Sequence, residues 1–265
     1  MKNMKDVKRI VVKVGSSTLT HPGGGLNFQK IDQLAMTLSD IKNSGIDVIL
    51  VSSGAVAAGV AKLQMRARPQ LMKEKQAAAS VGQCELMFIY DKFFSQYGQT
   101  ISQLLITKTV TTNVNLRENA INTLETLLDY GVIPIVNEND SVAVDEIAYG
   151  DNDTLSAVTA YIIQSDLLIL LSDIDGLYDE DPSQNPNASL IPVVNKIDAS
   201  IMKIAKGAGT SRGTGGMVTK IKAAQYAGKH GIPMIIANGR HPSILYDILR
   251  DTYRGTLFDI EKEEV

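Results

Sequence analysis

The sequence predicts an α/β protein, a three-layer α/β/α sandwich with a mainly parallel central sheet. Two observations lead to this prediction. Short apolar segments alternate along the chain with longer segments whose apolar residues recur at helical spacing. Clusters of Gly, Ser, Asn and Asp follow the apolar segments, as is typical where strands end in turns. Because ligands of open parallel sheets bind beyond the carboxyl ends of the strands, these clusters also indicate where a functional site lies.

The first half of the chain contains three predicted strands and two predicted helices. Residues 10–14, 48–51 and 101–106 are apolar bursts of strand length. Residues 28–43 carry apolar side chains at helical spacing and precede a glycine, which is a helix stop signal. A longer helix is expected at about 73–97.

The second half continues the same alternation. The predicted helices span about 115–130, 153–163 and 217–229, and the predicted strands span 132–136, 167–171 and 233–237. No internal repeat, low-complexity tract or linker interrupts this pattern, so we expect a single domain over residues 1–265.

The composition argues against several classes of protein. Lys plus Arg total 26 against 29 Asp plus Glu, a balance that does not favour nucleic-acid binding. No apolar run is long enough for a signal peptide or a membrane span, so we expect no membrane partner. The single cysteine, Cys84, excludes an internal disulfide, suits the cytoplasm and is expected to be a small packed residue. Three scattered histidines and one cysteine do not form a usual zinc site.

The first segment with a chemical signature is VVKVGSSTL, at residues 11–19. Lys13 stands near the end of the first predicted strand, and Gly15 opens the turn that follows. A cation beside exposed backbone N–H groups forms a cradle for phosphate. The alternative is an ordinary turn with a solvated lysine.

The second segment is KGAGTSRGTGGMVTK, at residues 206–220. Its glycines would let the backbone approach a ligand closely, and Lys220 falls in the first turn of the helix that follows. Lysine opposes the helix dipole there unless an anion lies between. The alternative is a flexible surface loop. No Walker sequence occurs, so Lys13 and Lys220 together suit a non-Walker site of phosphoryl transfer.

The third and fourth segments are rich in amides and carboxylates. NENDSV, at residues 137–142, is soon followed by GDNDTLSA, at residues 150–157. Their polar side chains suit an ammonium group and carboxylates, and so indicate an amino-acid acceptor. The side chains concerned are those of Asn137, Glu138, Asp140 and Asn152. Asp151 or Asn152 could instead serve only as a helix cap. LLSDIDGLYDEDP, at 170–182, ends a predicted strand and either lies beside a nucleotide or forms only tight turns.

Taken together, these segments resemble the amino acid kinase family, and most closely its members that phosphorylate L-glutamate. The resemblance spans about residues 10–258. The segments that carry it, in order, are VVKVGSSTL, VSSGAVAAG, VNENDSV, GDNDTLSA, LLSDIDGLYDEDP, GTGGMVTK and GTLF. It implies transfer of a phosphoryl group from ATP, with Mg²⁺, to the side-chain carboxylate of L-glutamate. The product is L-glutamyl 5-phosphate, in the first step of proline biosynthesis.

The resemblance also implies a role for individual residues. The N-terminal part would bind the acceptor, and the part from about residue 165 would bind ATP. Lys13 and Lys220 would contact the phosphates and Asp153 would hold both lysines. The implied glutamate-binding residues are Ser53, Gly54, Asn137, Asp140 and Asn152. The implied ATP-binding residues are Lys13, Gly15, Ser172, Asp173, Thr214, Gly215, Gly216, Met217, Val218, Thr219 and Lys220.

Further expectations follow from the same resemblance. We expect no protein cage for the metal, a dimer or tetramer, and feedback inhibition by L-proline. Related proteins often carry a C-terminal PUA domain; only Asp259–Val265 follow GTLF, so none is expected here. The alternatives are an aspartate or acetylglutamate kinase, or a nucleotide-binding sensor without catalysis.

Overall fold

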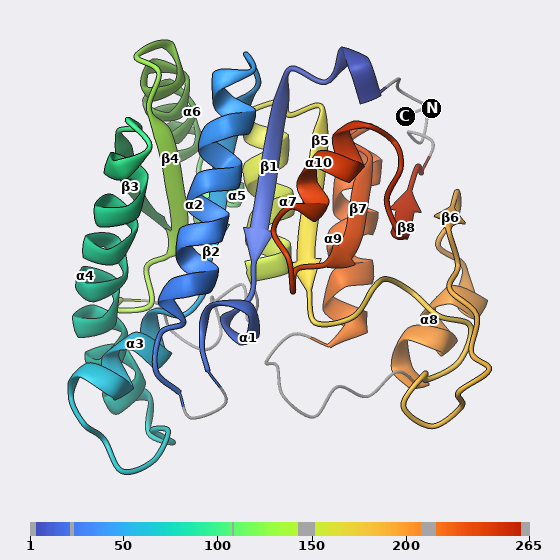
Figure 1. Ribbon diagram of the computed structural model, residues 1–265, viewed down its shortest axis with the longest axis horizontal. Coiled ribbons are helices and arrows are strands. Elements are labelled where there is room, and N and C mark those ends of the chain that lie inside the picture. Colours follow the sequence, from blue (N-terminus) through green and yellow to red (C-terminus); the bar gives the residue numbers. More distant parts are fainter. Residues whose placement is uncertain (1–3, 22–23, 108, 143–151, 208–215, 261–265) are drawn as a thin grey trace.

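An eight-stranded sheet runs through the middle of the protein in the computed structural model, which describes residues 4–21, 24–107, 109–142, 152–207 and 216–260 (Figure 1). The strands are β1 (Arg9–Val14), β2 (Asp47–Ser52), β3 (Ile101–Ile106), β4 (Ile133–Glu138), β5 (Leu167–Ser172), β6 (Val193–Val194), β7 (Met234–Asn238) and β8 (Gly255–Phe258). Their spatial order is β3-β4-β2-β1-β5-β7-β8-β6, and only the β7–β8 pair is antiparallel. The mainly parallel sheet is therefore confirmed.

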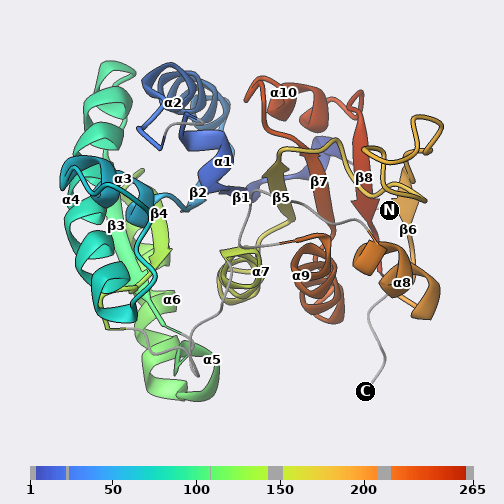
Figure 2. The same cartoon turned by 90° about the horizontal axis from the view of Figure 1, so that it is seen from below.

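Helices cover both faces of this sheet, which confirms the three-layer sandwich (Figure 2). The helices are η1 (Met4–Asp6), α1 (Ser16–Leu19), α2 (Phe28–Asn43), α3 (Ala55–Lys62), α4 (Met72–Gln96), α5 (Thr109–Thr112), α6 (Val114–Asp129), α7 (Asn152–Ile162), α8 (Ala199–Gly207), α9 (Met217–Lys229) and α10 (Ile244–Leu249). None of those within the described ranges is long and apolar enough to span a bilayer.

The two faces of the sheet contribute to two separate apolar clusters. In β1, Ile10, Val12 and Val14 pack with α2, α4 and α10, whereas Val11 packs with α6, α7 and α9. This division follows from the alternation of side chains along a strand. Lys13 has the same parity as Val11, so it projects from the face that α7 and α9 cover. The strand thereby delivers a lysine to the amino-terminal ends of those two helices.

Helices α3 and α4 pack against each other so closely that their backbones touch. A Cβ atom on Gly59 would lie 1.8 Å from the carbonyl oxygen of Ala78, and one on Gly82 would lie 1.7 Å from that of Ala55. No side chain fits at either glycine unless the helices separate. This contact fixes the position of α4 over the turn that leaves β2.

The predicted long elements all occur, with bounds shifted by a few residues at most. The short elements α1, α3, α5, α8, α10, β6 and β8 were not predicted because they contain too few residues to display a period. Cys84 departs from expectation: it is exposed, since it falls on the solvent side of α4. Its neighbour Gln83 turns to the buried side.

Candidate active site

Polar side chains gather at the carboxyl ends of β1, β2 and β4, where the amino-terminal turns of α7 and α9 meet them. At their centre lies Asp153, in the first turn of α7 and fully buried. A buried carboxylate requires hydrogen bonds and a counter-charge, because desolvation of an unpaired charge is costly. Its neighbours supply both.

Two lysines from distant parts of the chain share the carboxylate of Asp153. Nζ of Lys13 lies 2.5 Å from Oδ1, and Nζ of Lys220 lies 3.1 Å from Oδ2. Thr219 donates a further hydrogen bond to Oδ2 at 3.0 Å. The three residues proposed from the sequence as the catalytic group thus meet in the structure.

The two lysines of this cluster are buried. Lys13 is 6% exposed and Lys220 is 8% exposed. Two ammonium groups against one carboxylate leave these three side chains with a formal charge of +1. The amino-terminal ends of α7 and α9 add positive potential at the same place. The arrangement suits an anion, and Asp153 is the counter-charge that lets Lys220 occupy the first turn of α9.

A neutral network of amides lies next to the charged cluster. Nδ2 of Asn152 shares its two N–H groups among three acceptors: the carbonyl oxygen of Ser52 at 2.8 Å, Oγ of Ser53 at 3.0 Å and Oδ1 of Asn137 at 2.9 Å. Asn152 directly precedes Asp153, so the two networks join at adjacent residues. Asn152 is the first residue of α7, and its side chain bonds to residues outside that helix.

Asn137 extends the amide network to α4. Its Oδ1 also accepts from the backbone N–H of Glu138 at 2.9 Å, and its Nδ2 donates to Oε1 of Gln83 at 2.9 Å. No sequence motif points to Gln83. The available signal was a polar residue on the helical face that otherwise carries Ala79, Gly82 and Leu86. Tyr90, on the same face, hydrogen bonds with Oγ of Ser52 at 2.8 Å and was missed for the same reason.

The remaining acceptor-binding candidates lie in the turns that follow β2 and β4. Gly54 has a φ of 105°, a left-handed conformation that favours glycine, and it caps the amino terminus of α3. Asp140 is half-buried, and desolvation raises the pKa of its carboxyl group. An ammonium ligand would relieve that desolvation, since it would stabilise the ionised form.

The candidates for ATP binding cluster around β1, β5 and α9. Ser172 ends β5 and donates to Oδ1 of the exposed Asp173 at 3.2 Å. A Cβ on Gly15 would lie 3.8 Å from Nζ of Lys13, so the turn after β1 runs beside that ammonium group. Gly216 caps α9, which begins with Met217 and Val218. Thr214 and Gly215 lie outside the described residues.

The segment after Asp173 fastens the sheet together. Asp175 accepts hydrogen bonds from Asn238, at the end of β7, and from Arg254, just before β8. Both hydrogen bonds lower the pKa of the Asp175 carboxyl group, and the bond from Asn238 has the larger effect. Gly176 lies against Thr256, whose Oγ1 accepts from the backbone N–H of Leu177 at 2.8 Å. Of the two turns expected in this segment, the one at Asp181 is hydrogen-bonded, since its carbonyl oxygen accepts from the backbone N–H of Gln184 at 3.0 Å.

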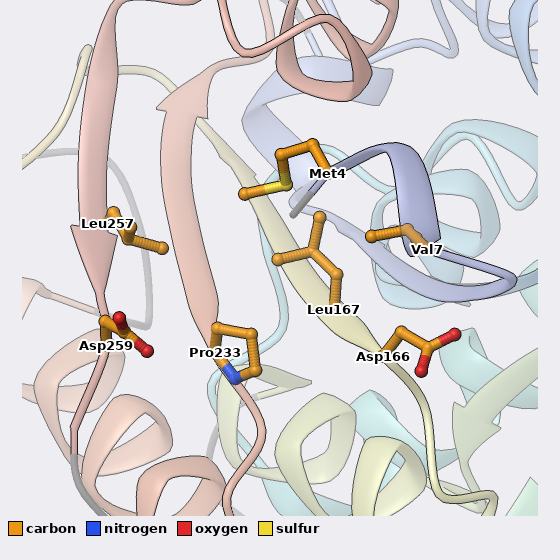
Figure 3. A pocket seen from close by; sticks show the side chains of 7 residues that line it. All are labelled: Met4, Val7, Asp166, Leu167, Pro233, Leu257 and Asp259. Carbon is orange, nitrogen blue, oxygen red and sulfur yellow. The ribbon is translucent and has the colours of Figure 1, made fainter. Parts of the chain in front are cut away.

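Two hollows lie away from the polar cluster. A cavity of about 10 Å³ between Met4, Val7 and Leu257 sits at the amino ends of the strands, opposite the polar cluster, and could hold about one water molecule (Figure 3). A larger hollow next to it is lined by Tyr161, whose ring stacks on that of His230. Neither is lined by Lys13, Asp153 or Lys220, so the candidate active site is identified here by geometry and charge.

No group of three or more His, Cys, Asp or Glu side chains suited to a metal ion occurs within the described ranges. Asp153, the most buried carboxylate, already binds two lysines. These residues fit a magnesium ion that is held mainly by nucleotide phosphates and water, as is usual for this ion in phosphoryl transfer. They do not form a cage of their own.

Comparison with known proteins identifies the class to which this fold and site belong. The model of the amino acid kinase family matches residues 8–238. The chain belongs to the amino acid kinase family. Within that family it resembles the glutamate 5-kinases. That of Clostridium acetobutylicum is 53% identical over 97% of this chain and 96% of its own length. That of Clostridium perfringens is 50% identical over 99% of both.

Solved structures support the same fold. Carbamate kinase from Giardia lamblia bound to AMP-PNP matches with a TM-score of 0.69 at 17% identity, covering 97% of this chain and all of that one. UMP kinase from Ureaplasma parvum matches with a TM-score of 0.66 at 17% identity, covering 96% and 99%. At this identity the likeness concerns the fold alone.

Proposed function

We propose that this protein is a glutamate 5-kinase. It transfers the terminal phosphoryl group of ATP to the side-chain carboxylate of L-glutamate, forming L-glutamyl 5-phosphate in the first step of proline biosynthesis. The observation that carries the proposal is the Lys13–Asp153–Lys220 cluster directly beside the amide network of Asn152. Identity of 50% or more to glutamate 5-kinases over almost the whole chain supports the choice of acceptor.

The reaction that these residues would catalyse needs charge neutralisation more than proton transfer. The side-chain carboxylate of glutamate, with a pKa of about 4.3, is already ionised at neutral pH, so no general base is required. The obstacle is repulsion between the carboxylate and the phosphates. Lys13 and Lys220 would stabilise the charge that spreads over the transferred phosphoryl group, and Asp153 would hold both ammonium groups in position.

The nucleotide would lie against the turn after β1, the end of β5 and the start of α9. Gly15, Ser172, Asp173 and the stretch from Thr214 to Lys220 are the residues we assign to it. Mg²⁺ would arrive with the phosphates, where it neutralises charge on them. Asp173 is exposed at the end of β5. Within the described ranges it forms no ion pair with a lysine, whereas Asp153 pairs with two.

The acceptor would lie over the amide network, in the N-terminal part of the domain. Asp140, whose carboxyl pKa is raised by desolvation, would pair with the ammonium group of glutamate. Ser53, Gly54, Asn137 and Asn152 would shape the rest of the site through neutral hydrogen-bonding groups. Neutral groups suit the acceptor because they bind carboxylates without holding a second phosphate.

Several wider expectations belong to the same proposal. We infer one domain over residues 1–265, with its ATP-binding part starting at about residue 165. We further propose a cytoplasmic location, a dimer or tetramer, and inhibition by L-proline at the acceptor site. Exposed Phe88 and Val81 on α4 offer apolar surface for assembly between subunits.

The proposal is tested by measuring ADP release from Mg-ATP with L-glutamate, L-aspartate or N-acetyl-L-glutamate in parallel. Hydroxylamine in the mixture traps an acyl phosphate as a hydroxamate. We expect ADP release and hydroxamate only with L-glutamate. Turnover with another acceptor would reassign the acceptor site but keep the roles of the lysines. ATP binding without turnover of any acceptor would favour a nucleotide sensor.

A further inference from the structure

A buried glutamine on α4 extends the amide network beyond the residues assigned so far. Gln83 is 9% exposed, and its Oε1 accepts a hydrogen bond from Nδ2 of Asn137 at 2.9 Å. Its Nε2 is buried and has no hydrogen-bond partner in the part of the chain that the structure describes. A buried N–H group without an acceptor is costly, and such a group in a native protein calls for an explanation.

The surrounding hydrogen bonds fix the orientation of this amide. Oδ1 of Asn137 accepts from the N–H of Glu138 and from Nδ2 of Asn152, so an oxygen must occupy that position. Nδ2 of Asn137 therefore faces Gln83, which must in turn present its oxygen. The nitrogen of Gln83, with two N–H groups, meets no acceptor among the described residues, and a bound ligand can supply one.

The chemistry of this nitrogen selects among the groups of an amino-acid acceptor. An N–H group cannot bind an ammonium, which also only donates, but it can donate to a carboxylate. The hydrogen bonds run from Gln83 through Asn137 to Asn152, the neighbour of Asp153, so we place Gln83 at the end of the network away from the lysines. The carboxylate that receives the phosphoryl group must lie close to Lys13 and Lys220. The carboxylate available to Gln83 is therefore the other one, on the α-carbon.

We propose that Nε2 of Gln83 donates a hydrogen bond to the α-carboxylate of the acceptor, so that Gln83 selects acceptors in which this carboxylate is free. The inference rests on the proposed function and adds a binding residue to the same site. The contact between α3 and α4 at Gly59 and Gly82 holds α4 rigidly in register for this role.

The substitution Gln83→Glu isolates the donor. Glutamate at this position keeps an oxygen for Nδ2 of Asn137 but replaces the N–H groups with a second oxygen, which repels a carboxylate. We expect kcat/KM for L-glutamate to fall at least about tenfold, mainly through KM, with KM for ATP unchanged. L-isoglutamine, in which the α-carboxylate is an amide, would instead donate to the new carboxylate. The preference for L-glutamate over L-isoglutamine should therefore fall at least about tenfold.

Two further variants keep the experiment decisive. Gln96→Glu makes the same chemical change at an exposed position of the same helix, and it should leave both the preference and KM unchanged. Gln83→Met removes the donor without adding charge, so it should also weaken the preference if Gln83→Glu does not fold. Glutamate turnover with an unchanged preference in the Gln83 variants would overturn this inference alone. Absence of glutamate turnover by the unmodified protein would overturn the proposed function and the inference with it.

Discussion

The two halves of the candidate active site are built on opposite principles. The proposed phosphate half consists of buried charges: two ammonium groups around one carboxylate, drawn from β1, α7 and α9. The proposed acceptor half consists mainly of neutral amides and hydroxyls, drawn from β4, α4, α7 and the turn after β2. The halves meet at the adjacent residues Asn152 and Asp153. The difference suggests a division of labour in which charge provides catalysis and neutral hydrogen bonds provide selection.

Removal of the central carboxylate should have the largest effect. Asp153→Asn leaves two buried ammonium groups without their shared counter-charge, and breaking such a buried pair costs about 3–5 kcal/mol. We expect a loss of roughly 6–20 °C in Tm, at about 2–4 °C for each kcal/mol, together with loss of activity. Asp129→Asn, at the exposed end of α6, is the matched control. An unchanged melting curve would show that the charged cluster is not held by Asp153.

Each lysine should affect the chemical step more than the binding of the acceptor. Lys13→Ala and Lys220→Ala each remove a group that we propose to stabilise charge in the transition state. We therefore expect kcat to fall by two or more orders of magnitude, as for loss of an oxyanion-type donor, roughly 10²–10³. KM for glutamate should change little. Lys222→Ala, exposed on α9 two residues from Lys220, serves as the control. Turnover close to that of the unmodified protein in either variant would refute the mechanism.

The amide network should show the opposite pattern. Asn152→Ala removes the hydrogen bonds to Ser52, Ser53 and Asn137, and we expect KM for glutamate to rise roughly 10–100-fold, as for hydrogen bonds to charged groups, with a smaller change in kcat. Initial rates over a range of glutamate concentrations measure both. Asn119→Ala on the exposed face of α6 is the control. A fall in kcat without a rise in KM would contradict the proposal that the amide network acts on glutamate binding and the lysines on the chemical step.

Substitution of Asp140 should have the smallest effect. It should raise the stability of the fold but weaken the binding of glutamate. The pKa of Asp140 is raised in the folded protein, so its ionised form opposes folding; the associated stability is present at low pH and is lost as pH rises through the raised pKa. Asp140→Asn should therefore raise Tm by a few degrees at pH 7, at about 2–4 °C for each kcal/mol. The same change should weaken glutamate binding.

A pH series separates these two consequences. As pH falls toward the raised pKa of Asp140, the carboxylate is neutralised and KM for glutamate should rise in the unmodified protein. In Asp140→Asn this part of the pH dependence should disappear. Steady-state kinetics and thermal melts at each pH provide both measurements. Identical pH profiles for the two proteins would exclude Asp140 from the ammonium site.

The sequence anticipated the parts of this architecture that local patterns encode. Long strands and helices follow from apolar periodicity, and Lys13 was identified because glycine and serine follow it at a strand end. Gln83 and Tyr90 were not predicted as site residues, because their role depends on which face of α4 meets β4. Helical spacing in the sequence does not contain that tertiary information. The contact at Gly59 and Gly82 was not predicted either, because nothing in the sequence indicates that two helical backbones touch.

The position of β8 has a consequence for how the chain reaches its final form. β8 is the last of the described strands in the sequence, yet it lies inside the sheet, antiparallel to β7 and parallel to β6. β6 pairs only with β8 within the described ranges. The side chain of Thr256 in β8 accepts a hydrogen bond from the backbone N–H of Leu177. During synthesis the strands up to β7 can associate as they emerge from the ribosome, whereas the segment around residues 173–194 must wait for the last strand. A nascent chain interrupted before Gly255 would therefore expose an unpaired edge of β7, which is a template for aggregation.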